Sequence, residues 1–260
     1  TIFQASGAIW SKHQTAYPYE VDGLIYTPMN TGVGGDRSKH ASELKSIRWE
    51  RSFKWKPPQY NTIDFLVEVK KQDGKDLVQQ KIHNIGENQS ITQYKTLILH
   101  CGFNAKESVM NPYNDMIHDK IPEKKSRDYE DFRNDYKPHP FQPSVPSDSQ
   151  AHLCYVPLES DDLGNLQMKT TETKDNFFHN TIIEFAYDNT DDSVDGPWKW
   201  KPIRVRYDKI ARLVNGERMY GNNFDTADNN WRSIHFPVTE KIIMGEESPF
   251  VKTSQEVVYY

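Results

Sequence analysis

The sequence predicts a mostly β fold of the α+β class, with a small antiparallel barrel and a helix near the C-terminus. Short apolar runs of strand length, broken by polar loops, recur from about residue 62 to 188, as they do in small barrels. Further apolar positions recur at spacings of three and four residues. This spacing predicts an amphipathic helix that is interrupted at Pro237. These positions are Trp231, Ile234, Val238, Ile242 and Ile243.

Length and composition narrow the classes of protein. The chain has 260 residues, enough for one large or two small domains with a sizeable core. Its hydrophobic fraction of 36% favours a soluble protein with long polar loops. The net charge of -5 gives no overall attraction to nucleic acid, so any phosphate binding must come from local clusters of cations.

The small number of cysteines and the lack of long apolar runs exclude further classes of protein. With only Cys101 and Cys154, we expect reduced thiols in a cytosolic setting rather than disulfides or a cysteine-based zinc site. The sequence has neither an apolar run of about 18 residues nor a secretory signal, so no membrane partner is expected. Because the chain begins with Thr1 rather than Met, we expect a piece of a longer polypeptide or a processed product.

The first predicted strand is Leu24-Ile-Tyr26, which follows Asp22-Gly23. An aspartate at this place can aim its carboxylate into a cleft and hold a divalent cation on a triphosphate. Asp-Gly is also a common turn before a strand, and the residues alone leave both interpretations open. In the polar loop 29–52, Gly32-Val-Gly-Gly35 lacks the Gly-Lys-Ser/Thr ending of a phosphate-binding loop.

The stretch Phe53-Lys-Trp-Lys-Pro57 predicts a basic strand. In an extended strand, Lys54 and Lys56 share one face, while Phe53, Trp55 and Pro57 take the other. Two lysines backed by aromatic rings make a positive field that fits a phosphate. An edge strand whose lysines discourage pairing with neighbours explains the same pattern.

Residues 61–83 predict a hairpin, with an alternating first strand at 63–69, a turn at Asp73-Gly74 and a return strand at 77–82. Thr96-Leu-Ile-Leu99 predicts a central strand that ends at His100 and Cys101.

Residues 104–150 are rich in charged residues and prolines and predict a long insertion without regular helix. Two further strands are predicted at Leu153-Cys-Tyr-Val156 and at 180–187. His139 and His152 have no partner at ligand spacing, so no metal is assigned to them.

A second basic strand is predicted within residues 198–209. Arg204, Arg206 and Asp208 are expected to share one face of it, beside Lys209. An arginine pair flanked by a carboxylate suits the β- and γ-phosphates of a triphosphate. An ion-pair ladder on an edge strand explains the residues equally well. Thr226 is expected to cap the helix that follows.

Several ordered stretches resemble GTP:mRNA guanylyltransferases, the capping enzymes of the lysine-nucleotidyltransferase superfamily. They are Asp22-Gly-Leu-Ile-Tyr-Thr-Pro28, Phe53-Lys-Trp-Lys-Pro57, Asn61-Thr-Ile-Asp-Phe-Leu66, and Arg204-Val-Arg-Tyr-Asp-Lys209 with Trp198 before it. The stretches 220–235 and 237–240, with the long insertions, look most like the multifunctional capping enzymes of large cytoplasmic DNA viruses. The resemblance covers nearly the whole chain, and several motifs in order are far more specific than one.

The resemblance implies a fold and a domain plan. Residues 1–66 would end a nucleotidyltransferase core with an ATP-grasp-like antiparallel sheet. Residues 67–245 would form an OB-fold barrel with an insertion at about 104–150 and a C-terminal helix. Residues 246–260 would be a linker, and covalently linked triphosphatase and cap methyltransferase domains are the expected neighbours.

The resemblance also implies roles for individual residues. Lys54 and Lys56 would contact the α-phosphate of GTP, and Asp22 would help to hold Mg²⁺ or Mn²⁺. The β- and γ-phosphates would be bound by Arg204, Arg206 and Lys209. Lys54, Lys56, Asp208 and Lys209 are the residues expected to be catalytic.

The expected reaction transfers GMP from GTP, through a lysine–GMP intermediate, to the 5′-diphosphate end of RNA. The nucleophilic lysine is expected upstream of Thr1. Lys71-Gln-Asp-Gly74 matches the superfamily's Lys-x-Asp-Gly signature, but it follows the motifs at Asp22 and Lys54, whereas the family's nucleophile precedes them. The expected location is the cytoplasm, in a viral factory or a virion.

Two alternatives stay open. An ATP-dependent polynucleotide ligase shares the fold and the paired lysines, and competition between GTP and ATP would distinguish the two enzymes. A non-catalytic OB-fold module could instead bind single-stranded RNA through surface tryptophans and lysines.

Overall fold

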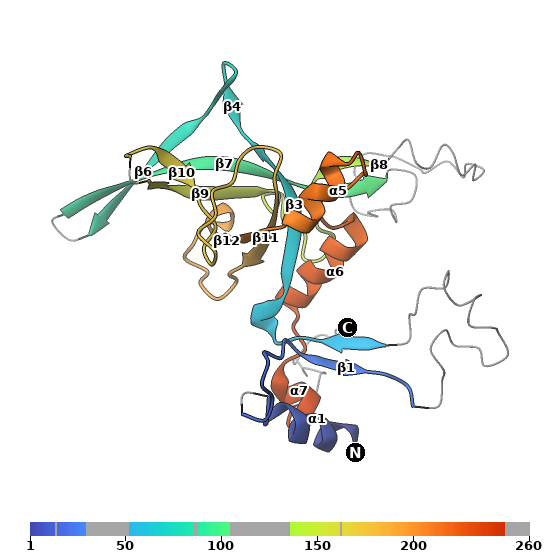
Figure 1. Ribbon diagram of the computed structural model, residues 1–260. Coiled ribbons are helices and arrows are strands. Elements are labelled where there is room, and N and C mark those ends of the chain that lie inside the picture. The colour runs from blue at the N-terminus through green and yellow to red at the C-terminus, as the bar shows by residue number, and fades with distance from the viewer. Residues whose placement is uncertain (14, 30–51, 86–87, 105–135, 162, 248–260) are drawn as a thin grey trace. The chain divides into compact units, whose positions relative to one another are not determined.

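The computed structural model describes residues 1–13, 15–29, 52–85, 88–104, 136–161 and 163–247 (Figure 1). These residues form two compact units, one from 1–61 with 236–260 and the other from 62–235. Strands outnumber helices along the described chain, and every pairing between named strands is antiparallel. The expectation of a mostly β, α+β fold is therefore confirmed.

The first unit packs two short helices and a two-stranded sheet around a small core. Trp10, Trp55 and Ile243 form this core, and the Trp55 indole Nε1 donates to the Val238 carbonyl at 2.6 Å. Thr1 and Thr239 cap the two helices through their side chains. The elements are α1 (Ile2–Trp10), β1 (Leu24–Tyr26), β2 (Phe53–Trp55), η2 (Pro58–Tyr60) and α7 (Glu240–Met244).

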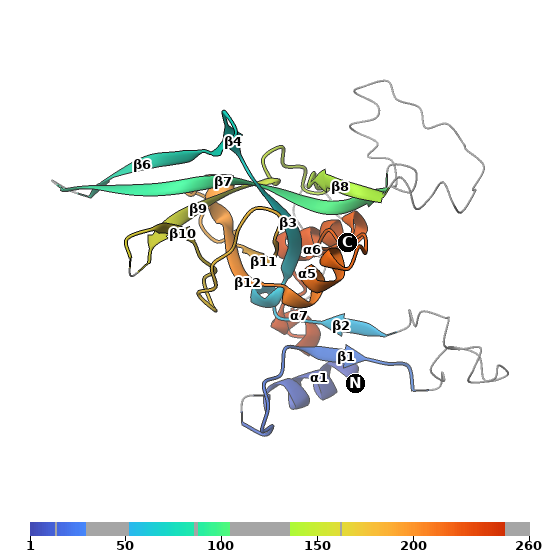
Figure 2. The same cartoon turned by 45° about the horizontal axis from the view of Figure 1, so that its top comes forward.

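The second unit is built on one curled sheet with the strand order β10-β9-β7-β3-β11-β12 (Figures 1 and 2). Its long strand β7 also pairs with β6 and β8, so it spans the sheet. The strands are β3 (Thr62–Val69), β6 (Val78–Ile85), β7 (Asn88–Asn104), β8 (Tyr136–Pro140), β9 (Leu153–Ser160), β10 (Leu166–Met168), β11 (Ile182–Tyr187) and β12 (Trp200–Val205).

Three helices and a small hairpin complete the second unit. They are α4 (Gly196–Lys199), α5 (Tyr207–Val214), α6 (Phe224–His235), and the hairpin of β4 (Lys71–Gln72) with β5 (Lys75–Asp76). The core lies inside the curl of the sheet, where Phe65, Leu97 and Trp200 are fully buried or nearly so. Helix α6 adds Trp231 to this core, and the Trp231 indole Nε1 donates to the Pro146 carbonyl at 2.9 Å.

The strands expected at 63–69, 96–99 and 153–156 lie within strands of the structure. The strand expected at 180–187 is also present, but it begins two residues later, at Ile182. The helical stretch is also confirmed, because α6 ends before Pro237 and α7 begins after it.

Three local predictions are wrong. The two long strands that flank Asp73-Gly74, β3 and β6, do not pair with each other. The turn closes only the short β4–β5 hairpin, while β3 and β6 each pair with β7. Strand β7 continues past Cys101 to Asn104. Thr226 is not a cap but lies inside α6, where its backbone N–H donates to Asn223 Oδ1 at 2.9 Å.

Two prolines of the expected insertion lie in a strand at the edge of the sheet. Pro138 and Pro140 belong to β8, which pairs with the end of β7; prolines are tolerated in strands at sheet edges. Residues 32–35, 105–135 and 248–260 lie outside the described residues, and the expected domain boundaries stay a prediction. Within the described part of the chain, no helix is long and apolar enough to cross a membrane.

Candidate functional site

A row of charged side chains crosses three neighbouring strands of the second unit. Glu184 of β11 lies opposite Asp64 of β3 on one side and opposite Arg204 of β12 on the other. Residues directly opposite in antiparallel strands point to the same face of a sheet. A bulge between Glu184 and Phe185 shifts the register with β12, so that Arg204 meets Glu184. Bulges commonly re-aim a side chain in this way.

Asp64 binds two of the cations that the sequence singled out. Its Oδ2 atom accepts from Arg206 Nη1 at 2.5 Å and from Lys209 Nζ at 2.6 Å. The Asp64 side chain is only 7% exposed, so these charge-assisted bonds replace the water that the carboxylate loses on folding. Asn222 fixes the backbone of the same residue, with bonds of 2.7 and 2.8 Å to the Asp64 amide and carbonyl.

Gly221 allows the segment that contains Asn222 to approach the Asp64 backbone closely. Its φ is +86°, and a Cβ atom there would lie 2.2 Å from the Asp64 carbonyl oxygen. Only glycine fits such a position without moving the backbone. The segment that follows α5 is thereby held against the strand that carries the buried carboxylate.

Glu184 is the second buried carboxylate of the row. It accepts from Thr62 Oγ1 and from Arg204 Nε, both at 2.6 Å. Burial acts to raise the pKa of Glu184, but the hydrogen bonds from Thr62 and Arg204 and the nearby arginine charges outweigh it and lower the pKa below its ordinary value. Glu184 therefore stays ionised and keeps Arg204 in place.

Arg206 and Asp208 do not lie on a strand as predicted. Strand β12 ends at Val205, Arg206 precedes α5, and Asp208 lies in the first turn of that helix. The two side chains still meet, because Arg206 donates from Nε and Nη2 to the two Asp208 oxygens, each at 3.0 Å. This fork raises the pKa of Arg206 and lowers the pKa of Asp208. Both groups are charged at neutral pH.

The charges of this cluster cancel, since three cations (Arg204, Arg206 and Lys209) face three carboxylates (Asp64, Glu184 and Asp208). The members differ in exposure. Arg204 and Asp208 are 54% and 64% exposed, while the side chains of Asp64 and Lys209 are at most 15% exposed. An incoming anion can therefore reach the outer pair while the inner pair keeps the cluster in place.

Asp64 and Glu184 were not among the residues predicted to form a site. Asp64 stands in a quoted motif, and Glu184 stands in a strand that the sequence identified. Each occupies a position in an alternating strand where a polar residue normally faces solvent. The only signal in the sequence was an apolar residue on the same face of each strand as the carboxylate, such as Leu66 beside Asp64 and Ile182 beside Glu184. Both of these apolar residues are buried.

The first unit holds the other predicted residues. Asp22 Oδ2 lies 2.9 Å from Lys56 Nζ and 3.2 Å from Lys54 Nζ. The hydrogen bond from Lys56, followed by the one from Lys54, lowers the pKa of Asp22. β1 and β2 bring the three residues together, since Leu24 pairs with Trp55. Asp22 is 61% exposed and Lys54 is 51% exposed, so the cluster faces solvent.

The expected aromatic wall behind these lysines is only partly present. Trp55 and Pro57 are buried, but Phe53 is 73% exposed. Gly23 makes the pairing of β1 with β2 possible, because a Cβ atom there would lie 2.0 Å from the Trp55 carbonyl oxygen.

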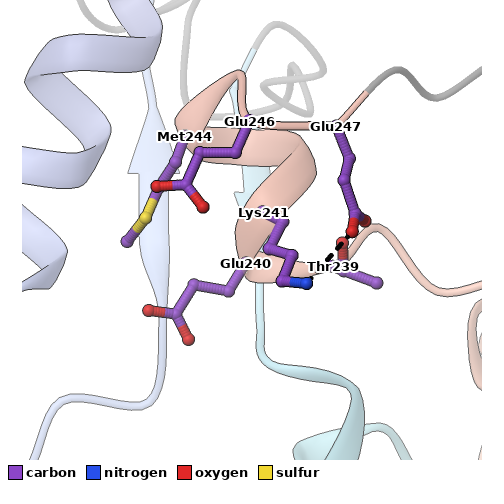
Figure 3. Close-up of a pocket in the computed structure, with 6 residues that line it drawn as sticks. All are labelled: Thr239, Glu240, Lys241, Met244, Glu246 and Glu247. Atoms are coloured by element: carbon purple, nitrogen blue, oxygen red, sulfur yellow. Dashed lines mark ion pairs between the residues drawn. The ribbon is translucent and has the colours of Figure 1, made fainter.

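The hollow beside α7 fits a phosphate poorly, because acidic side chains line it. The hollow beside α7 in Figure 3 is lined by Glu240, Glu246 and Glu247, and Lys241 is paired with Glu247 at 3.2 Å.

Within the described residues, no group of three or more His, Cys, Asp or Glu side chains is arranged to hold a metal ion. Lys71, which carries the partial match to the nucleophile signature, is exposed beside the β4–β5 turn. An exposed lysine at a hairpin is not in the buried setting in which an amine nucleophile is activated.

Comparison with known proteins gives one informative match. No family model matches the chain. The chain is 29% identical over 260 residues to a protein described as a probable mRNA-capping enzyme of Acanthamoeba polyphaga mimivirus. The match covers 96% of this chain and 18% of the relative's length. The resemblance to an mRNA-capping enzyme of a large DNA virus is thereby confirmed, for a segment that spans less than a fifth of that relative.

Proposed function

We propose that this chain is the part of a viral mRNA guanylyltransferase that binds the phosphates of GTP while GMP is transferred to the 5′-diphosphate end of RNA. The similarity to a capping enzyme over almost the whole chain supports a role in capping. The observation that carries the guanylyltransferase assignment is the cluster around Asp64. There, buried carboxylates hold Arg206 and Lys209 of the Arg-x-Arg-x-Asp-Lys motif in a fixed arrangement.

In this proposal the cluster of the second unit, which we take to be an OB-fold, binds the β- and γ-phosphates. Arg204 is exposed enough to meet an anion, and Arg206 presents a planar fork that matches phosphate oxygens. Asp208 must release part of that fork when a phosphate arrives, and Glu184 and Asp64 keep the arginines from turning away. The cations then stabilise the charge that develops on the departing pyrophosphate.

Lys54 and Lys56 of the first unit are proposed to contact the α-phosphate. Their ammonium groups already meet at the Asp22 carboxylate, which shows that both can bind one anionic group. A phosphate oxygen is a comparable anionic ligand for two point charges. The attacking lysine is proposed to lie in another part of the longer polypeptide, as the motif order indicates.

Asp22 fits the role of a single protein ligand to Mg²⁺ or Mn²⁺. Mg²⁺ in nucleotide sites is commonly bound by one or two carboxylates together with substrate phosphates, and Asp22 offers one exposed carboxylate with a lowered pKa. The bound ion would neutralise charge on the triphosphate. Asp22 itself would orient Lys54 and Lys56 toward the same place.

The test is formation of the covalent guanylate adduct from radiolabelled GTP by the complete capping enzyme. Lys54→Ala and Lys56→Ala are expected to abolish the adduct, because each removes a cation from the reacting phosphate. Lys12→Ala removes an exposed lysine from the first unit and serves as the control. Competition with unlabelled GTP and ATP tests the nucleotide class. An adduct that survives Lys54→Ala, or that ATP suppresses better than GTP, would overturn the proposal.

A further inference from the structure

Three aromatic rings form a cluster on the outer face of the second unit. Tyr94 of β7 lies 4.9 Å from both Tyr155 of β9 and Trp198 of α4, and Tyr155 lies 5.2 Å from Trp198, measured between ring centroids. All three side chains are partly exposed. Cys154 and Val156, on either side of Tyr155, are in the core. Because successive residues of a strand point to opposite faces, Tyr155 points outward.

Lys81 lies over one ring of this cluster, and Lys70 lies in the chain beside it, since its backbone N–H donates to the carbonyl of Thr96, the register partner of Tyr155. Lys81 Nζ lies 4.7 Å from the Trp198 ring centroid, a cation–π arrangement. Lys70, Lys71 and Lys75 lie on or beside the β4–β5 hairpin, which stands out from the sheet in both views (Figures 1 and 2). Among the described residues, no carboxylate lies at ion-pair distance from any of these four lysines. By contrast, Lys95 is paired with Asp76 at 2.8 Å.

The segment that carries these lysines has a net positive charge, although the protein as a whole is acidic. Residues 70–85 and 88–95 contain five lysines and two aspartates, a balance of +3 with histidine neutral, whereas the whole chain carries -5. Lysines without carboxylate partners can bind phosphates without first breaking an ion pair. Partly exposed rings beside them offer faces on which bases can stack. Neither feature alone indicates a ligand, but together they match the two chemical parts of a single-stranded nucleic acid.

We propose that the ring cluster of Tyr94, Tyr155 and Trp198, with Lys81 and the lysines of the β4–β5 hairpin, binds single-stranded RNA. Bases stack on the rings, and the lysines contact the phosphates that link them. The surface thus holds the body of a transcript, while a different site acts on its 5′ end. The choice of RNA rather than single-stranded DNA rests on the proposed function, whereas the surface itself is argued from its residues.

The opposite face of the same strands differs in chemistry. Ile82 of β6 and Ile91 of β7 are register partners, and both are more than 60% exposed there. Gln79, which pairs with Tyr94, instead accepts from Thr96 Oγ1 at 2.6 Å on the outer face. An apolar pair fits a peptide better than a nucleic acid, so the proposed RNA surface is the outer face alone.

Charge is tested with two matched double variants of the 260-residue chain. Lys71→Gln with Lys75→Gln alters the proposed surface, and Lys137→Gln with Lys174→Gln removes the same charge from other exposed positions of the second unit. Binding is measured by fluorescence anisotropy with a labelled 12-nucleotide RNA that carries a 5′-diphosphate. Each phosphate contact of a single strand contributes about -0.7 to the slope of log affinity against log salt. The first pair is expected to reduce the magnitude of that slope by about 1.4, and the second to leave it unchanged.

Stacking is tested at Tyr155. Tyr155→Leu keeps an apolar side chain but removes the ring face, and about a tenfold loss of RNA affinity is expected from one stacked base. Tyr155→Phe keeps the ring and is expected to bind as the parent does. Urea denaturation of each variant shows whether the fold is retained. Because Phe and Leu differ little in polarity, a difference in RNA affinity between them reports the loss of the ring rather than a change in polarity.

Equal losses for the two lysine pairs, equal affinities for Tyr155→Leu and Tyr155→Phe, or stronger competition by duplex DNA or by an acidic peptide would each overturn this inference. Formation of the guanylate adduct is measured in the complete enzyme with the same substitutions and is expected to be unchanged. An intact adduct with unaltered RNA binding refutes the RNA surface alone. A failure of the Lys54→Ala test refutes the proposed function and leaves the surface measurements to stand.

Discussion

Lys209 Nζ lies 2.6 Å from Asp64 Oδ2, and this bond joins the first turn of α5 to the buried face of β3 across 145 residues of sequence. Arg206 donates to the same oxygen. One carboxylate therefore holds two cations of a basic motif that lies far away along the chain. The arrangement leads to predictions about stability, pH dependence and activity.

Asp64→Asn is expected to destabilise the second unit by about 3 kcal/mol, because it leaves two largely buried cations without their shared counter-charge. Asp208→Asn removes a carboxylate of the same cluster that is 64% exposed, and its cost should stay below about 1 kcal/mol. Urea denaturation followed by tryptophan fluorescence measures both. Equal costs for the two variants would mean that burial of Asp64 does not set the strength of its ion pairs.

Glu184→Gln is expected to flatten the acid side of the stability curve. The folded-state pKa of Glu184 is below its ordinary value of 4.5, so the stability it contributes is complete above that value. This contribution is lost as pH falls through the lower, folded-state pKa. The free energy of unfolding, measured from pH 7 to pH 3, should therefore drop less steeply in the variant below about pH 4.5. Parallel curves for the two proteins would contradict the assignment.

Gly221→Ala is expected to destabilise the second unit more than Gly216→Ala. Both glycines have positive φ, +86° and +82°, so each alanine carries a backbone cost of about 1 kcal/mol. A Cβ atom at Gly221 would also meet the Asp64 carbonyl at 2.2 Å, while at Gly216 it would meet nothing within 4 Å. The difference between the two melting temperatures therefore measures the cost of the steric clash with the Asp64 carbonyl alone. Similar temperatures would show that the segment can move away from Asp64 at little cost.

Local patterns in the sequence were enough to find most strands but not their partners. The alternation around Phe65 and Phe185 places the core-facing residues of β3 and β11 on one face of each strand, a condition that any partner strand would satisfy. Asp73 and Gly74 do adopt the positive φ values of a tight turn, 51° and 77°. The predicted long hairpin does not form, because β3 and β6 each pair with β7 instead of with each other.

The cations and the exposed carboxylates of the site were predictable from the sequence, but its two buried carboxylates were not. Lys54, Arg204 and Arg206 stand in short motifs with recognisable spacing. Asp64 and Glu184 become site residues only because the fold places arginines against them, and Arg206 is 142 residues from Asp64. A carboxylate in an alternating strand looks like a solvent-facing residue until its partner is known. Pairings over such distances are set by strand register, which local periodicity does not encode.

Arg206→Lys is expected to impair guanylylation much more than Arg204→Lys. Arg206 uses Nε and Nη2 on Asp208 and Nη1 on Asp64, so three bonds in one plane fix its position. A lysine ammonium keeps the charge but cannot span both carboxylates. In the structure Arg204 is held by Glu184 through Nε and is 54% exposed, so a flexible lysine can keep much of its role.

The measurement is adduct formation by the complete enzyme across a range of GTP concentrations. For Arg206→Lys we expect a loss of about a hundredfold in the maximal rate, as found when a reacting group is misplaced by about 1 Å. For Arg204→Lys we expect a higher KM with a nearly unchanged maximal rate, since charge is kept and only its placement loosens. Urea denaturation of both variants separates misplacement from unfolding. If the maximal rate falls equally in both, the fork between Arg206, Asp208 and Asp64 does not position the motif for catalysis.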